Sequence, residues 1–74
     1  MGENNTTTET VGEALPKEMA RVRDLIPRYE SIGPAGGFAV AMMKSDLDRA
    51  AEAMAEGDTV EMIRVLAKLR DYET

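Results

Sequence analysis

The chain has 74 residues, a net charge of −5, and neither cysteine nor histidine. The two missing residue types exclude disulfides, cysteine or histidine zinc sites, thiol nucleophiles and a histidine general base, so we expect neither an enzyme nor a cofactor. The acidic balance opposes nucleic-acid binding, and no apolar run reaches the length of a membrane span, so a soluble cytoplasmic protein without a membrane partner is predicted.

The first twelve residues, MGENNTTTETVG, contain almost no large apolar side chain. Ordering them would cost conformational entropy without burying much surface. Residues 1–12 are therefore predicted to form a disordered tail, and residues 13–74 a single helical domain.

A first helix is predicted to start near Leu15, because Pro16 suits an opening turn and apolar residues then recur at spacings of three and four. Pro27 cannot donate to the carbonyl oxygen four residues earlier. We expect a kink there, since Tyr29 keeps the helical register. The apolar face, widened by Leu25, consists of Leu15, Met19, Val22, Ile26 and Tyr29.

A long second helix is predicted over Pro34–Glu56, after a left-handed turn residue at Gly33. The run FAVAMM within it would also suit a buried strand, but nothing else in the chain alternates with period two to pair with it. Ser45 and Asp48 form an S-x-x-D pair, which leaves open a break of this helix near Lys44.

A third helix is predicted to follow Gly57, to start at a capping-box analogue formed by Asp58 and Glu61, and to run to about Tyr72. The short connection requires the second and third helices to form an antiparallel hairpin. The predicted fold class is therefore all-α, a three-helix bundle with a kinked first helix and a long second one. The inner face of the third helix is predicted to be Met62, Leu66 and Leu69, flanked by Ile63, Val65 and Tyr72.

Two segments have some features of a ligand site, but neither matches the pattern that such a site needs. The run GPAGGFAVAMMKS places its lysine and serine two helical turns beyond its last glycine, whereas a phosphate loop needs them directly after a glycine that follows a strand. An anion held by the amides of this helix start remains an open alternative. Asp48, Glu52 and Glu56 share one helical face but lack the calcium-loop pattern, so a solvated face is expected and no metal site is predicted.

The second helix is apolar on all sides in its first half. Its predicted core stripe comprises Val40, Met43, Leu47, Ala50, Ala51 and Met54. Phe38 and Met42 point roughly to the opposite side, so either the first helix or another subunit must cover them. Small residues beside them would allow close helix approach. The interface candidates are Gly36, Phe38, Ala39 and Met42.

The segments YESIGPAGGFAVAMM and LDRAAEAMAEGDTVEMIRVLAKLRDYE contain an IGPAG motif and an AMA-x-GD helix junction. In these motifs the chain resembles small uncharacterised bacterial and prophage-type proteins over about residues 17–73. The resemblance implies a compact helical fold and a mobile-element origin. It carries over no catalytic or binding residue.

The predicted function is a non-enzymatic helical module that acts through protein contact, most simply as a homodimer through Phe38 and Met42. No small-molecule substrate is apparent. One alternative is an acidic regulator of a basic partner, because residues 46–74 carry eight acids against four bases. Another is a nucleic-acid-binding accessory that uses the bases of the first helix, which are Lys17, Arg21, Arg23 and Arg28.

Overall fold

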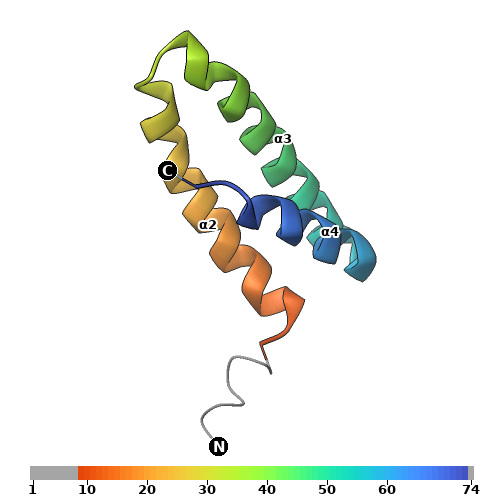
Figure 1. Ribbon diagram of the computed structural model, residues 1–74. Helices are drawn as coiled ribbons and strands as arrows, with labels where there is room; N and C mark the ends of the chain where they lie inside the picture. Colours follow the sequence, from red (N-terminus) through yellow and green to blue (C-terminus); the bar gives the residue numbers. More distant parts are fainter. Residues whose placement is uncertain (1–8, 74) are drawn as a thin grey trace, which may run out of the picture.

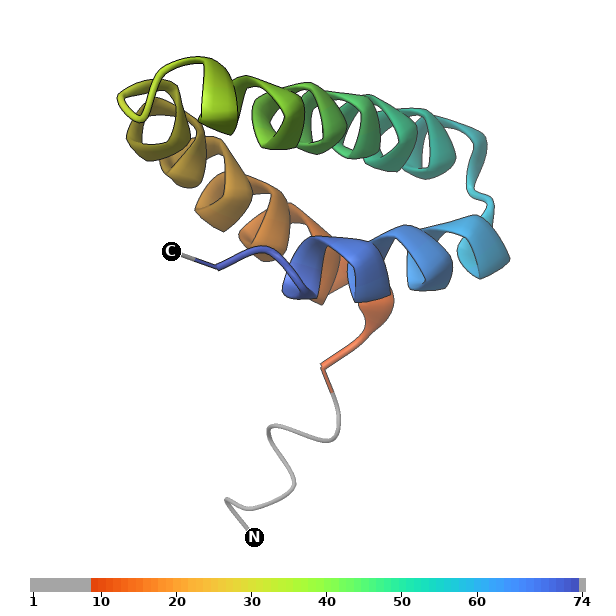
Figure 2. The same cartoon turned by 45° about the horizontal axis from the view of Figure 1, so that its top comes forward.

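The computed structural model describes residues 9–73, which form three α-helices and contain no strand. The helices are α2 (Val11–Glu30), α3 (Pro34–Glu56) and α4 (Thr59–Arg70). The chain turns back sharply between α2 and α3, and again between α3 and α4 (Figures 1 and 2). Each helix packs against both of the others. The predicted all-α three-helix bundle is confirmed.

Apolar side chains from all three helices meet in one core. The prediction for α3 was partly wrong, because Ala51 and Met54 are exposed and Ala53 is buried in their place. Ala53 belongs to the core cluster that side chains of α4 complete, so the buried side of α3 is turned toward it. On α4 itself, Ile63 is exposed. The main core residues are Leu15, Met19, Val22, Leu25, Met43, Leu47, Ala50, Ala53, Met62, Val65, Leu66 and Leu69.

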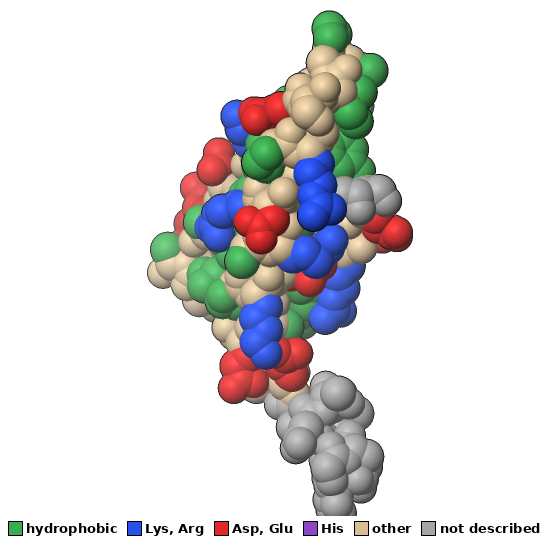
Figure 3. All heavy atoms as spheres, turned by 90° about the vertical axis from the view of Figure 1, so that its left-hand side faces the viewer, with side chains coloured by type: hydrophobic (Ala, Val, Ile, Leu, Met, Phe, Trp, Pro, Cys, Tyr) green, Lys and Arg blue, Asp and Glu red, His purple; other side chains and the backbone are tan. Residues whose placement is uncertain are grey.

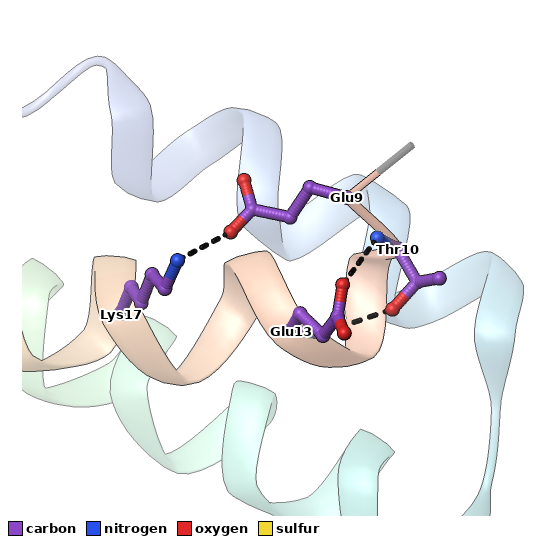
Figure 4. A network of polar contacts seen from close by, with 4 residues as sticks. All are labelled: Glu9, Thr10, Glu13 and Lys17. Atoms are coloured by element: carbon purple, nitrogen blue, oxygen red, sulfur yellow. Dashed lines mark hydrogen bonds and ion pairs between the residues drawn. The ribbon is translucent and has the colours of Figure 1, made fainter. Parts of the chain in front are cut away.

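Helix α2 begins with a complete capping box (Figure 4). The hydroxyl of Thr10 accepts a hydrogen bond from the Glu13 amide at 3.2 Å, and the Thr10 amide donates to the Glu13 carboxylate at 3.1 Å. Two amides that the helix start would otherwise leave unpaired are thereby satisfied. One turn further, Lys17 Nζ lies 2.8 Å from the Glu9 carboxylate.

The predicted boundary between tail and helical domain, after residue 12, was therefore wrong, because α2 is capped by Thr10 and begins at Val11. Pro16 lies inside α2 and not at its opening turn. The polar composition of the segment concealed a T-x-x-E capping signal at its end. The rest of the predicted tail, residues 1–8, lies outside the described residues.

Glycines lie in both turns, as predicted, but Gly33 caps the start of α3 and lacks the left-handed helix-ending conformation expected of it. Gly33 has φ 94° and ψ −151°, a conformation essentially restricted to glycine, and Pro34 follows as the first residue of α3. Gly57 is left-handed, with φ 67° and ψ 28°, and ends α3. The Asp58 carboxylate then accepts from the Glu61 amide at 3.1 Å and caps α4.

The two longer helices are continuous. Helix α2 passes through Pro27 to Glu30, as expected, while the kink there stays a prediction. Helix α3 passes through Lys44 and Ser45, so the break left open at that point does not occur. Helix α4 ends at Arg70, slightly before the predicted end.

Helix α4 is too short to cover α3. It has 12 residues against 23 in α3, which correspond to lengths of about 18 Å and 35 Å. Near its start, Glu61 lies 3.7 Å from Arg49 of α3, and just beyond its end Tyr72 contacts Asp46. The pairing therefore uses the second half of α3 and leaves the first turns uncovered on that side (Figure 1).

Candidate interaction surface

Phe38 and Met42 form an apolar strip on the uncovered part of α3. The side chain of Phe38 is 76% exposed and that of Met42, one turn later, is 45% exposed. The alternative in which the first helix covers them does not hold, because neither is buried against α2. The first ten residues of α3, PAGGFAVAMM, carry no charge. Hydrophobic side chains run along one edge of the molecule at the end where α2 meets α3 (Figure 3).

The other two interface candidates belong to internal packing. Gly36 is buried, and a methyl group there would lie 2.0 Å from the carbonyl oxygen of Tyr29 at the end of α2. Ala39 is partly buried and packs against the core. The prediction that these two residues line an exposed interface was wrong, since the close approach that they permit is already used between α2 and α3.

A hollow of about 220 Å³ adjoins the strip where α4 ends against α3. Met42 belongs both to the strip and to the wall of this hollow. We call it the Tyr72 hollow, and its lining residues are Met42, Asp46, Lys68, Asp71 and Tyr72.

A buried carboxylate lies at this hollow. Asp46 is 6% exposed, accepts a hydrogen bond of 2.7 Å from the Tyr72 hydroxyl, and lies 3.7 Å from Arg49. These partners satisfy a group that would be costly to bury alone. Burial, followed by the hydrogen bond to Asp46, raises the pKa of Tyr72 to about 12, so the phenol stays neutral and donates at ordinary pH.

Sequence reasoning missed Asp46, although a signal exists. The residue lies three positions after Met43 and four before Ala50, which are both fully buried. Residues at these spacings share a helical face, so a carboxylate there had to find a partner inside the bundle. That partner, Tyr72, lies 26 positions away in the sequence, and no local pattern identifies it.

Arg21 joins α2 to the end of α4. Its guanidinium donates to the carbonyl oxygens of Leu69 and Tyr72, both at 2.9 Å, and to the Glu18 carboxylate at 2.7 Å. The carbonyls at a helix end lack partners within the helix, and a cation is favourable there. Nearby, the Tyr29 hydroxyl donates to the Glu73 carbonyl. These contacts hold the chain in place after α4.

The same contacts bear on the predicted nucleic-acid surface of the first helix. Of its four bases, Arg21 is engaged with α4, and Lys17 is paired with Glu9. Positive and negative side chains are interspersed on the α2 side of the molecule (Figure 3). This face therefore lacks the contiguous positive patch that binds a phosphate backbone.

Other ligand types find little support within residues 9–73. The predicted solvated row of Asp48, Glu52 and Glu56 is exposed, and no group of three or more acidic side chains in this part of the chain is placed to hold a metal ion. None of the described helices is long and apolar enough to cross a membrane.

No protein-family model, curated protein or solved structure matches this chain.

Proposed function

We propose that this chain is a small non-enzymatic helical module of the cytoplasm that acts through protein contact and associates with itself through Phe38 and Met42. The observation that carries the proposal is the 76% exposure of Phe38, the only phenylalanine of the chain. An aromatic side chain buries about 150–250 Å² when it is covered. Aromatic residues and methionine are also enriched in protein interfaces.

The length of α4 supplies the physical reason for association. A longer α4 would have covered the first turns of α3 within one chain. A second copy offers an equivalent apolar surface, and a chain of 74 residues gains stability by burying surface against it. The net charge of −5 opposes self-association. The uncharged first half of α3 is where two copies approach with the least repulsion.

The test compares oligomeric state between surface variants. We expect the wild type to sediment as a dimer and to melt at higher temperature as its concentration rises. The double variant Phe38→Gln with Met42→Gln is expected to sediment as a folded monomer. The control is Val60→Gln with Ile63→Gln, which removes two exposed apolar side chains of α4 and should leave the dimer intact. A monomeric wild type, or dissociation only by the control pair, would overturn the proposal.

The two other predicted roles have weaker support. The nucleic-acid role loses Arg21 and Lys17 to contacts within the chain. No contact among the described residues favours the role as an acidic regulator of a basic partner over self-association. A mobile-element origin stays a prediction from the resemblance.

A further inference from the structure

We propose that, in this dimer, the Phe38 ring of each subunit docks into the Tyr72 hollow of the other. The inference rests on the proposed self-association and adds to it the site that receives Phe38. It makes the hollow incomplete without a second copy. Two features support it: the direction in which Phe38 leans, and the size and chemistry of the hollow.

The direction of helical side chains prevents Phe38 from filling its own hollow. Long side chains on a helix lean toward the N-terminus, over the preceding turn. Met42 and Asp46, which line the hollow, lie one and two turns after Phe38. The ring therefore leans away from them, toward the turn between α2 and α3, and its high exposure agrees with this.

A second copy with an antiparallel α3 reverses this direction. When the two α3 helices cross midway between Phe38 and Met42, the backbone of the partner's Phe38 lies beside Met42. Its side chain points toward the N-terminus of the partner's α3, which is the direction of Asp46 and Tyr72, and so enters the hollow. The two-fold symmetry of such a dimer repeats the contact, because each subunit presents the same surface to the other.

The hollow is open to the surface and has room for a phenyl ring, with Met42 and Tyr72 as its uncharged lining and Asp46, Lys68 and Asp71 as its charged lining. Its volume is about 220 Å³, and a cavity of about 150 Å³ is enough to hold benzene. The Met42 thioether and the Tyr72 ring offer sulfur–aromatic and aromatic–aromatic contacts. The Lys68 ammonium at the same site offers a cation–π contact. Asp46 is already hydrogen-bonded to Tyr72, so its carboxylate is satisfied before the ring enters.

The N-terminal segment of the chain is a poor occupant by comparison. Residues 1–8 contain one large apolar side chain, Met1. They contain no aromatic residue, whereas a second copy brings the Phe38 ring.

The absence of cysteine makes a direct test possible, because every introduced thiol is unique. Phe38→Cys protein is mixed with isotope-labelled Lys68→Cys protein under mild oxidation, and disulfide-linked species are identified by intact mass. This mixed dimer retains one unmodified docking contact, from Phe38 of the Lys68→Cys subunit. We expect the mixed disulfide to exceed both disulfides between identical chains. In the matched control, Ala67→Cys replaces Lys68→Cys one residue earlier on α4, and the mixed disulfide should fall to background.

The outcomes separate the docking from the proposed function. If the wild type is a monomer, both proposals fail. If the wild type is a dimer that the Phe38 and Met42 double variant dissociates, but Lys68→Cys gives no more mixed disulfide than Ala67→Cys, the docking is wrong and the self-association stands. Phe38, Ala67 and Lys68 are all exposed, so each cysteine variant should keep the fold, and circular dichroism checks this.

Discussion

Replacing Gly36 by alanine tests how closely α3 approaches α2. The added methyl carbon would lie 2.0 Å from the carbonyl oxygen of Tyr29 and 2.9 Å from its carbonyl carbon. Unstrained carbon–oxygen contacts begin at about 3.3 Å. The two helix backbones must therefore separate by more than about 1 Å. The Tyr29 oxygen cannot simply rotate away, because it accepts the Ile32 amide in the turn at 3.1 Å.

The magnitude follows from two opposing effects. Overpacking costs about 1–3 kcal/mol and sometimes more, whereas alanine in a helix is better than glycine by about 0.5–1 kcal/mol. We expect Gly36→Ala to lower the free energy of unfolding by about 2 kcal/mol, because the clash is between backbones and not with a mobile side chain. The whole free energy of unfolding of a chain of 74 residues is about 4–11 kcal/mol. The melting temperature should fall by about 8–16 °C.

Gly37 provides a matched control one residue later. A methyl group there meets nothing within 4 Å, so Gly37→Ala gains helix propensity without a clash. Its melting temperature should rise by about 2–8 °C. Thermal melts of both variants and the wild type, followed by circular dichroism at one protein concentration, measure the difference. If Gly36→Ala melts at or above the wild type, the close contact between α2 and α3 is wrong.

Two further predictions concern the contacts around the end of α4. Arg21→Met should lower the free energy of unfolding by about 2 kcal/mol, because the carbonyl oxygens of Leu69 and Tyr72, at and just beyond the end of α4, lose a charged donor. Arg23→Met, on exposed surface of the same helix, should change the free energy of unfolding by less than about 0.5 kcal/mol. Urea unfolding measures both variants, and equal midpoints for Arg21→Met and Arg23→Met would contradict the capping role of Arg21. In a variant whose other tyrosine is phenylalanine, Tyr72 should ionise near pH 12 by ultraviolet absorbance, above its ordinary pKa of about 10. Because the folded pKa is the higher one, the contribution of Tyr72 to stability is complete below about pH 10 and is lost toward pH 12. Asp46→Asn should lower this midpoint partway, and a midpoint already at the ordinary value in the parent would refute the buried hydrogen bond.

Helix boundaries were predictable because the signals that set them are local. The bounds of α3, from Pro34 to Glu56, match the prediction at both ends. A glycine with positive φ, a proline at the first helical position and a capping carboxylate each act within three or four residues. The start of α2, which Thr10 caps, depends on a signal of the same kind. It was missed because the polar composition around it was interpreted as a tail.

The partners of the helix faces were not predictable in this way. The first half of α3 is apolar on all sides, so the pattern predicted that Phe38 and Met42 need a cover without indicating which element provides it. Their exposure follows from where a 12-residue α4 docks along a 23-residue α3. The contacts of Arg21 with the end of α4 join residues 48 and 51 positions apart. Such contacts depend on helix lengths and crossing positions throughout the bundle, which a period of 3.6 residues does not encode.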